Sequence, residues 1–382
     1  MKIVHITQYY NDGYSYQENL LPRYQKKMGY DVVIITSDRM SSFINDSSRV
    51  VGEGTFIDNE VKVIRLPIYS EFRKGFVFFK GLDSVLEEEN PDYIFHHGLA
   101  APSLVTVAKY KMRNPNVYLA VDNHADYHNT KSMHLLKMIY YHLTWKPVIQ
   151  RYREYVDVFY SVTPGCKVFA ERELGIPQSK HELLFLGADS EMFHFDEDWR
   201  REIRGELGFT NDDFVMITVG KLDRLKKTDL IVKAMKEMDS EKVKLIIVGS
   251  IEKNYGAYLD SLIGDDKRII KIGWVQSSEI YKYFSASDLA IFPGSQSVLW
   301  QQAVACEIPL LIRYTIDSEY LIAAGNGLNI FSDDHKEIKQ IISILINNKL
   351  MIKEMSEKAR FVRDNIFSYE KIAQKSLEIR RA

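Results

Sequence analysis

Four cationic side chains crowd into one short segment, Lys221 to Lys227, directly after a strand-like run that ends at Gly220. They are Lys221, Arg224, Lys226 and Lys227. A helix is expected to follow, with Thr228 as its N-cap and an apolar stripe that includes Ile231 and Met235. Cations at a helix N-terminus oppose the helix dipole, so an anion such as a phosphate is expected to bind between them. The alternative is a solvated lysine run.

A second candidate anion site lies in Ser287 to Arg313, which has the pattern of a strand, a tight turn, a helix and another strand. Three polar residues stand where that helix is expected to begin, so their amides and hydroxyls can face an anion. They are Ser295, Gln296 and Ser297. Open α/β sheets bind ligands at the carboxyl ends of their strands, where this turn is expected. A plain turn with an N-cap residue is the alternative.

Histidines gather at the ends of two strand-like runs in the first half of the chain. His96 and His97 follow one run, and HADYH, His124 to His128, follows another. Two imidazoles and a carboxylate can hold zinc, but histidines at strand ends also line polar clefts, and we predict no metal site. In the loop after the first strand, Gly13 can let the backbone approach a ligand or can serve as a plain turn.

The elements that must position these residues alternate along the whole chain. Apolar runs predict strands at 2–7, 32–36, 61–65, 93–95, 117–121 and 156–162, and again at 214–219, 243–248, 269–272, 289–292 and 310–312. Tyr14 to Met28 is expected to hold a helix that ends at Gly29. Such alternation predicts an α/β fold with mostly parallel sheets covered on both faces. Small and acidic residues interrupt it around Leu186 to Glu197, where we place the domain boundary.

Composition excludes several classes of protein. A length of 382 residues favours two or three domains, and a net charge of −2 gives no reason to expect nucleic acid as a partner. Cys166 and Cys306 are too few for a disulfide framework and are expected to be buried in a reducing compartment. The amino terminus lacks the features of a signal peptide, and no apolar run approaches the ~20 residues of a membrane span. A cytoplasmic location is expected.

A basic segment without acidic residues runs from Lys131 to Arg153. Its cations alternate with apolar and aromatic side chains such as Leu143 and Trp145. A helix of this composition can lie on an anionic membrane surface, which suits peripheral attachment to the inner face of a membrane. Alternatively, its apolar side packs on the sheet. The shorter aromatic run from Phe76 to Phe79 is expected to pack on the sheet.

The chain as a whole resembles the family 4 glycosyltransferases, retaining enzymes of the GT-B fold. The resemblance rests on KIVHITQYY and GYDVVIITSD in the first half, LGADSEMF at the boundary, and VGKLDRLKKTDLIVKAM, VKLIIVG, IIKIGWVQSSEIYKYFSASDLAIFP and QAVACEIPLLI in the second. It implies two Rossmann-like domains facing a cleft, with an acceptor-side domain at 1–190 and a nucleotide-sugar-binding domain at 191–365. A terminal helix at 366–382 would cross back onto the first domain.

The resemblance also assigns roles to residues. Lys221 and Lys226 would neutralise the donor pyrophosphate and His124 would lie beside the sugar, so these three are the expected catalytic residues. The expected donor-binding residues are Gly13, Gly220, Lys227, Gly273, Trp274, Val275, Ser295, Gln296, Ser297 and Gln302. Of these, Gly273 to Val275 correspond to the region of the nucleotide base. No cofactor or metal is expected, because the basic loop replaces the cation, and the expected donor is a UDP-sugar.

One part of the family pattern, a pair of glutamates, is missing. The second glutamate aligns with Gln302, which can hydrogen-bond ribose hydroxyls without a charge. The first has no counterpart, because the loop that begins at Pro293 is short. Glu307 and Gln301 are near in sequence but in the wrong register. The donor sugar is therefore expected to be held by the serines and the glutamine of the 295–297 segment.

The sequence thus predicts a metal-independent, retaining hexosyltransferase that moves a sugar from a nucleotide-diphosphate sugar to a hydroxyl of a glycolipid or polysaccharide glycan. Two alternatives stay open. A sugar-nucleotide epimerase of the same fold would need acidic residues in the cleft for acid-base chemistry. A catalytically degenerate relative would bind a nucleotide or a partner transferase without turnover.

Overall fold

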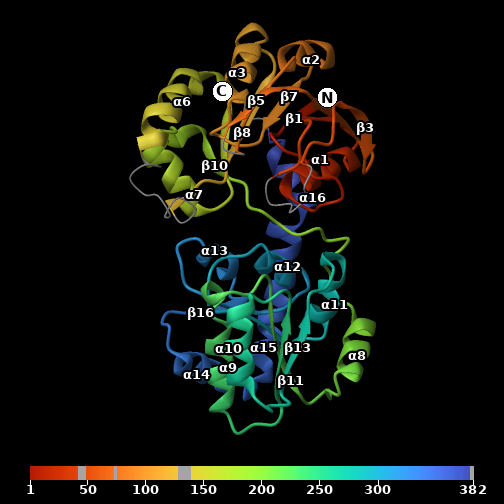
Figure 1. Ribbon diagram of the computed structural model, residues 1–382, viewed down its shortest axis with the longest axis vertical. Coiled ribbons are helices and arrows are strands. Elements are labelled where there is room, and N and C mark those ends of the chain that lie inside the picture. The colour runs from red at the N-terminus through yellow and green to blue at the C-terminus, as the bar shows by residue number, and fades with distance from the viewer. Residues whose placement is uncertain (42–48, 73–74, 128–138, 379–382) are drawn as a thin grey trace. The chain divides into compact units, whose positions relative to one another are not determined.

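The chain folds into two compact units, shown in Figure 1 as a computed structural model. The structure describes residues 1–41, 49–72, 75–127 and 139–378. Unit 1 comprises Met1–Leu186 with Tyr369–Ala382, and unit 2 comprises Gly187–Ser368. The boundaries expected from sequence were 190/191 and 365/366.

Unit 1 is built on an eight-stranded sheet in the order β10-β9-β8-β7-β1-β2-β4-β3, in which only β3 runs antiparallel to its neighbour. The order reverses between β1 and β7, because the chain first builds outward from β1 through β2 and then returns to its other side. The strands are β1 Lys2–Ile6, β2 Asp31–Ser37, β3 Gly54–Asp58, β4 Val61–Leu66, β7 Tyr93–His96, β8 Tyr118–Asn123, β9 Val158–Ser161 and β10 His181–Leu183.

Helices cover both faces of this sheet, because its strands are apolar on both sides. Ile3 and Val4 are neighbours in β1, and both are fully buried, in two different core clusters. A hairpin of β5 Ile68–Phe72 and β6 Phe76–Phe79 is added to the unit. The helices are α1 Gln17–Lys27, α2 Leu82–Glu89, α3 Ser103–Arg113, α6 Lys146–Tyr152, α7 Pro164–Phe169 and α16 Tyr369–Ser376.

The last helix, α16, packs against α1, so the prediction that the end of the chain crosses back onto the first domain is confirmed. The rings of Tyr24 and Tyr369 lie 6.0 Å apart, and Gln25 Nε2 donates to Ser376 Oγ at 3.0 Å. The chain passes between the two units twice, near Ala188 and near Phe367. The two segments are hydrogen-bonded to each other, since Ala188 N donates to Phe367 O at 3.0 Å.

Unit 2 is built on a six-stranded parallel sheet in the order β13-β12-β11-β14-β15-β16. Its order reverses between β11 and β14. The strands are β11 Phe214–Val219, β12 Val243–Val248, β13 Ile269–Gly273, β14 Leu289–Phe292, β15 Leu310–Arg313 and β16 Gly327–Ile330. The helices are α8 Glu197–Glu206, α9 Thr228–Lys236, α10 Lys253–Ile263, α11 Ile280–Ser285, α12 Leu299–Ala305, α13 Glu319–Ile322, α14 His335–Ile346 and α15 Lys349–Val362.

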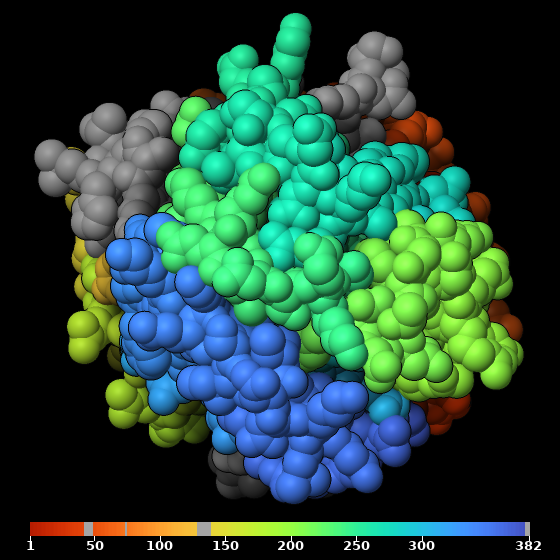
Figure 2. Space-filling view, turned by 90° about the horizontal axis from the view of Figure 1, so that it is seen from below, coloured from red at the N-terminus to blue at the C-terminus, as the bar shows by residue number. Residues whose placement is uncertain are grey.

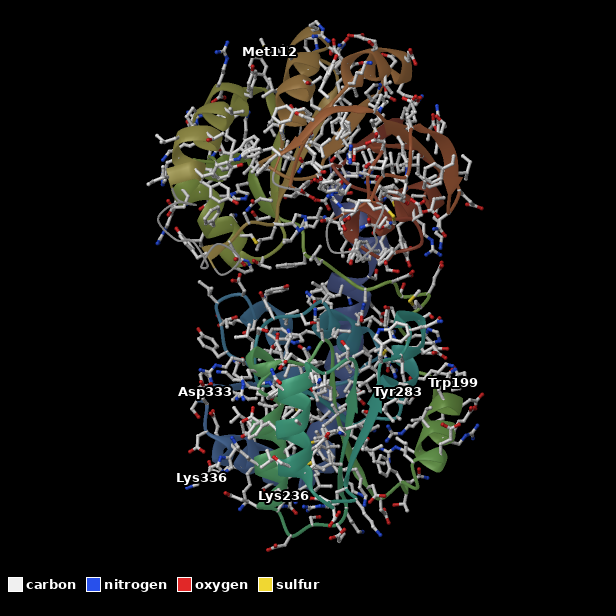
Figure 3. The ribbon with its side chains drawn as sticks, viewed as in Figure 1. Met112, Trp199, Lys236, Tyr283, Asp333 and Lys336 are labelled. Atoms are coloured by element: carbon white, nitrogen blue, oxygen red, sulfur yellow. The ribbon has the colours of Figure 1, made fainter. Side chains whose placement is uncertain are left out.

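The helices of unit 2 pack in neighbouring pairs. Helix α14 lies beside α9, blue and green in Figure 2. Helices α8 and α11 pack together on the side that carries Trp199 and Tyr283, opposite the side of Asp333 (Figure 3). Two guanidinium groups of α8 hold Asp288 before β14, with Arg200 Nη2 at 2.6 Å and Arg204 Nη2 at 2.7 Å from its carboxylate oxygens.

The predicted alternation is confirmed, since every run expected to be a strand forms one. Several short strands were missed. The sequence of β16, GLNI, contains two residue types that are rare in strands. Cys166 and Cys306 are buried, as predicted. Among the helices that the structure describes, none is long and apolar enough to cross a membrane.

The basic segment from Lys131 to Arg153 is described only from residue 139 onward. Part of its apolar side packs into the core, since Trp145 and Ile149 are buried. Leu143 and Ile139 remain 74% and 44% exposed. The short aromatic run packs partly as predicted: its first and last residues lie against the core, whereas Phe78 is exposed.

Candidate functional site

Each unit has one point at which its strand order reverses, and the predicted site residues lie in loops close to these two points. Loops that leave neighbouring strands in opposite directions open a crevice at the carboxyl edge of a sheet, where α/β proteins bind ligands. In unit 2 this point lies between β11 and β14, and in unit 1 between β1 and β7. Gly13 and His124 belong to unit 1, and all the other predicted site residues belong to unit 2.

The basic loop after β11 is shaped by its own backbone. Gly220 has φ +143°, and its carbonyl oxygen would lie 2.0 Å from a Cβ at Gly249, so the loops after β11 and β12 run in close contact. Asp223 Oδ1 accepts hydrogen bonds from the amides of Leu225 and Lys226 at 2.9 and 3.3 Å. The expected N-cap, Thr228, is instead the first residue of α9, and Lys227 precedes it with φ +52°. The prediction of the cap was wrong, because Asp223 turns the chain one turn earlier.

Lys226 joins this loop to the loop after β14, across the reversal point of the sheet. Its Nζ donates to the carbonyl oxygens of Ser295 and Gln296, each at 2.9 Å. Ser295 N donates to Leu225 O at 2.9 Å, and a Cβ at Gly294 would lie 2.1 Å from that same oxygen. Burial lowers the pKa of the Lys226 ammonium. Two segments predicted separately from sequence are thus brought together by one side chain and one glycine.

The other cations of the loop differ in their surroundings. Lys227 Nζ pairs with Asp333 after β16 at 2.6 Å, and Arg313 Nη1 reaches the same carboxylate at 3.1 Å. The Arg224 guanidinium lies over the ring of Tyr258, 5.5 Å from its centroid. Lys221 is exposed at the sheet edge. Among the described residues, Lys221 and Lys226 are therefore the lysines of this loop that form no ion pair with a carboxylate.

The loop after β14 reaches its helix later than predicted. Helix α12 begins at Leu299, and Val298 rather than a serine is its N-cap, so the expected start at 295–297 was wrong. Ser295 and Gln296 are exposed, and Gln296 Nε2 donates to Asp317 O after β15 at 2.9 Å. Within the described residues, the Oε1 atom of Gln302 on α12 is buried without a hydrogen-bond partner.

The segment expected to meet the nucleotide base leaves β13 at the same edge. Gly273 has φ +83°, and its carbonyl accepts from Gly249 N at 2.7 Å, which ties it to the β12 loop. The Trp274 side chain is 70% exposed, and Val275 beside it is half-buried. An aromatic ring held in solvent by a fixed loop offers a stacking surface.

The glutamate and glutamine that the sequence placed in the wrong register are engaged elsewhere. Glu307 pairs with Arg360 and Arg363, each at 2.6 Å. Gln301 is buried, and its Nε2 donates to Tyr320 Oη at 3.2 Å. Neither replaces the missing glutamate.

In unit 1 the loop after β8 presents His124, whose side chain is 44% exposed. Its Nε2 lies 3.3 Å from Oδ2 of Asp122, a fully buried carboxylate that the sequence analysis missed. His97 Nδ1 lies 3.1 Å from the same oxygen. Gly13 forms a turn with φ +74° and open space around it. A carboxylate directly after the apolar run in VYLAVD was the signal that could have revealed Asp122.

The ionisable groups at this edge shift one another's pKa values. Burial lowers the pKa of His124 and the Asp122 carboxylate raises it, with an upward net shift. The His124 side chain is partly exposed, so the Asp122 carboxylate outweighs burial. Burial raises the pKa of Asp122, but His124 and His97 lower it by more, so the group is ionised. Burial raises the pKa of Glu18 in the first turn of α1.

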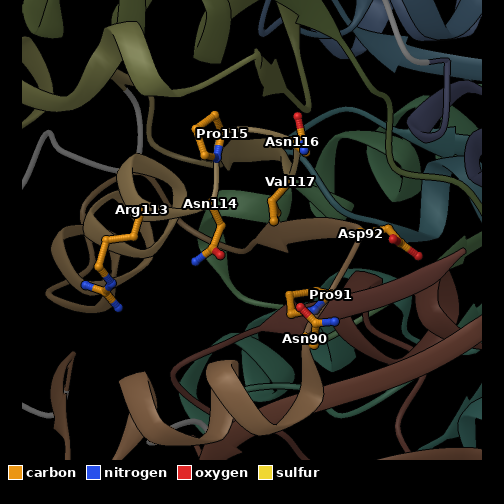
Figure 4. Close-up of a pocket in the computed structure, with 8 residues that line it drawn as sticks. All are labelled: Asn90, Pro91, Asp92, Arg113, Asn114, Pro115, Asn116 and Val117. Carbon is orange, nitrogen blue, oxygen red and sulfur yellow. The ribbon is translucent and has the colours of Figure 1, made fainter.

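Within the described part of the chain, neither a group of metal ligands nor the two pockets described next indicate a second functional site. Among the described residues, no three His, Cys, Asp or Glu side chains are grouped to hold a metal ion, and His128 lies outside those residues. A pocket in unit 1 is lined by Asn90–Asp92 and Arg113–Val117 (Figure 4). These segments precede β7 and β8, so this pocket lies at the amino edge of the sheet, away from the histidines. A hollow beside α15 is also at the amino edge, before β14 and β15.

Comparisons with known proteins agree with this architecture. The family "Glycosyltransferase Family 4" matches residues 19–191, and the family "Glycosyl transferases group 1" matches residues 200–361. A stretch of 158 residues is 25% identical to the alpha-monoglucosyldiacylglycerol synthase of Acholeplasma laidlawii and spans 39% of this chain and 39% of that protein.

Solved structures share the fold over nearly the whole chain. The Anabaena protein Alr3699/HepE, in complex with UDP, has a TM-score of 0.72 at 16% identity and covers 99% of both chains. A Listeria monocytogenes protein described as a UDP-N-acetylglucosamine 2-epimerase has a TM-score of 0.62 at 14% identity, over 98% of this chain and 94% of its own. The two family matches together span most of the residues, and the chain belongs to the family 4 glycosyltransferases of GT-B fold.

Proposed function

We propose that the protein transfers a hexose from a UDP-sugar to a hydroxyl acceptor, with retention of the anomeric configuration and without a metal or other cofactor. The observation that carries the proposal is the Lys226 bridge between the loops after β11 and β14. A lysine ammonium has three N–H donors, and two of them are committed to the carbonyls of Ser295 and Gln296. The third remains to meet an anion at the reversal point of the sheet.

Charge stabilisation is the role proposed for the basic loop. In glycosyl transfer, negative charge develops on the departing nucleoside diphosphate, and fixed cations stabilise it best in a preorganised site. Lys221 is exposed at the edge, Lys226 is fixed to the neighbouring loop, and both are placed on the pyrophosphate. Lys227 supports them through Asp333. The cations take the place of a divalent metal.

Retention follows the family chemistry. The bond between the anomeric carbon and the leaving phosphate oxygen breaks as the acceptor oxygen bonds to the same face of that carbon. The acceptor proton passes to the departing phosphate, so no protein nucleophile is required. His124 is placed beside the sugar, with Ser295, Gln296 and Ser297 toward its hydroxyls, Gln302 toward the ribose, and Trp274 with its neighbours toward the base.

The acceptor proposed is a lipid-linked or polysaccharide glycan, reached at an anionic membrane surface. The name of the Acholeplasma relative, a glucosyldiacylglycerol synthase, supports a lipid acceptor. So do the exposed apolar side chains on the hairpin and on the basic segment, which meet through the Phe76 and Trp145 rings at 5.7 Å. They are Tyr69, Phe72, Phe78, Ile139 and Leu143. Binding to anionic vesicles should weaken as salt rises. Absence of binding at any salt concentration would remove the membrane from the proposal.

The test of the activity begins with a thermal-shift panel of UDP, GDP, ADP and CDP, followed by their sugars. A ligand at a hundredfold over its Kd adds ~2.7 kcal/mol of stability. UDP should stabilise the wild type and fail to stabilise Lys221→Ala. Transfer of labelled sugar to a glycolipid, with the anomer of the product read by NMR, then decides the reaction. An inverted product would overturn retention, and stabilisation by none of the nucleotides would overturn the donor site.

Two other activities are decided by the same assay. An epimerase of this fold would convert the UDP-sugar without an acceptor. The ionisable cluster around Asp122 in unit 1 contains groups that acid-base chemistry of this kind could use. A degenerate partner subunit would bind UDP and leave the UDP-sugar unchanged. Product analysis with and without acceptor separates the three.

A further inference from the structure

A chain of polar side chains runs inward from His124 through the core of unit 1. Asp122 Oδ2 faces His97 Nδ1 at 3.1 Å, His97 Nε2 lies 3.1 Å from His5 Nδ1, and His5 Nε2 lies 2.6 Å from Gln25 Oε1. Asp122 and His5 are fully buried. The chain crosses three neighbouring strands at the reversal point of the sheet, from the end of β8 through β7 to β1.

The far end of this chain fixes the direction of its hydrogen bonds. Ser376 Oγ donates to Ala373 O at 2.8 Å and therefore accepts from Gln25 Nε2 at 3.0 Å. The Gln25 amide is thereby oriented with Oε1 toward His5, so His5 Nε2 carries a hydrogen. At the near end, Gly98 N donates to Asp122 Oδ1 at 2.7 Å, which fits an ionised carboxylate that accepts from His97 Nδ1.

Counting hydrogens then gives the charge of the two buried rings. The three bonds from Asp122 to Gln25 need three N–H groups on the rings of His5 and His97, whereas two neutral imidazoles supply only two. The pair therefore carries one positive charge. Burial, and the neighbouring His97, lower the pKa of His5 to about 3. His97 is the ring of this pair that faces the Asp122 carboxylate, at 3.1 Å.

Asp122 is consequently shared between a buried cation and the partly exposed ring of His124. We propose that Asp122 is the positioning residue of His124, and that the positive charge of the His5–His97 pair sets, through Asp122, how readily His124 is protonated. This inference rests on the role of His124 in the proposed function. Oδ2 of Asp122 lies 3.3 Å from Nε2 of His124, the contact through which Asp122 would orient the ring.

The other charged groups around His124 fit this arrangement. Glu18, in the first turn of α1, interacts electrostatically with both His97 and His124. His96, on β7, faces Asp122 as well, but burial lowers its pKa to about 4, so it is neutral and bonded to Ser103 Oγ at 2.8 Å. Asp122 and Glu18 are thus the acidic groups that face the His5–His97 pair and His124 in this cluster.

Two substitutions in the full chain are expected to move the titration of His124 in opposite directions. Asp122→Asn removes the carboxylate and should shift it to lower pH. His97→Gln removes the cation that neutralises Asp122 and should shift it to higher pH. The titration is read from the ring resonances of ¹³C-labelled histidine, assigned with His124→Gln. His335, paired with Glu237 at 2.8 Å in unit 2, serves as the internal reference that should not move.

Shifts in the same direction, or no shift in either variant, would overturn the proposal, because a merely structural role predicts no opposed effect. If Asp122→Asn fails to fold, His97→Gln decides, since it must raise the titration. The measurement needs no turnover, so it stands apart from the proposed function. Opposed titration shifts without a matching change in the pH profile of sugar transfer would retain the charge chain and reject the role of His124 in transfer.

Discussion

The reversal points of the two sheets share a topology and differ in their chemistry. In unit 2 the loops after β11 and β14 are joined by a lysine, backbone carbonyls and a glycine, and Lys226 is the only titratable side chain in that contact. In unit 1 the corresponding strands bring together histidines and a carboxylate, buried in the core. One edge therefore presents lysine ammonium groups, and the other presents imidazoles, the side chains whose charge changes most readily near physiological pH.

The difference fits the two halves of a glycosyl transfer. A diphosphate leaving group carries negative charge at any physiological pH, so its site needs cations that do not titrate there. An acceptor hydroxyl and a sugar are neutral, and a site for them can use groups whose protonation is adjustable. One chain thus combines lysine cations at the edge of unit 2, here called fixed charge, with histidines at the edge of unit 1, here called adjustable charge.

The largest expected effect is an acid sensitivity confined to unit 1. Burial lowers the pKa of His5 to about 3, and of His96 and His181 to about 4. Because these folded-state values lie below the unfolded value of about 6.5, the unfolded chain takes up protons first. Stability is then lost as pH falls from about 6.5 toward 4, by about 2 kcal/mol for each group at pH 5. Urea denaturation at pH 7 and pH 5, with the surviving fragment identified by pulse proteolysis, measures it.

Unit 2 should keep its stability over that interval. The carboxylates whose pKa is lowered there, such as Asp266 beside Arg268, lose their contribution only as pH falls through their own depressed values. His96→Asn is the matched variant, because it removes one group and should reduce the pH slope of unit 1. Parallel losses in both units would break the division between fixed and adjustable charge.

The next effect concerns Lys226. Lys226→Ala should lower kcat/KM by about 10²- to 10³-fold, the usual cost of removing one preorganised charge-stabilising donor. The affinity for UDP should fall with it, since the loops after β11 and β14 lose their bridge. Lys236→Ala is the control, an equal change of charge in the last turn of α9, the helix that follows this loop (Figure 3). Unchanged affinity for UDP in Lys226→Ala would show that the pyrophosphate binds elsewhere.

Much of this architecture was predictable from sequence. Alternating apolar runs located the strands, and their order gave two α/β halves with candidate sites at the carboxyl edges. The cations of the 221–227 loop were visible as a pattern. Their partners were not, because Asp333 and the Ser295 carbonyl are distant in sequence and meet Lys227 and Lys226 only through the order of the strands.

The buried chain in unit 1 was missed for a related reason. His5 and Asp122 lie inside apolar strands, where a polar residue gives no sign of its partner. Their contacts depend on β1, β7 and β8 lying side by side, an order that alternation alone does not specify. Family resemblance identified His124, but only the structure supplied the carboxylate behind it.

A smaller effect should come from Gly294→Ala. An added Cβ would lie 2.1 Å from Leu225 O and 2.5 Å from the Lys226 carbonyl carbon, so the two loops must separate. We expect UDP to bind about tenfold to a hundredfold more weakly, equivalent to ~1.4–2.8 kcal/mol. Gly205→Ala, in α8 with open space around it, should leave binding unchanged. Wild-type affinity in Gly294→Ala would mean that contact between the loops is not needed to form the anion site.

The smallest effect tests whether the edge of unit 2 recognises anything besides charge. Trp274 is 70% exposed and contributes little to packing, so Trp274→Ala should leave the stability of the protein unchanged. If its ring stacks on the base, UDP affinity should fall by about tenfold, or ~1.4 kcal/mol, by calorimetry. Trp274→Phe should retain most of the affinity. Trp274→Ala could bind UDP like the wild type while Lys226→Ala does not. In that case this edge binds only the diphosphate, and selectivity for the base must come from another loop at that edge.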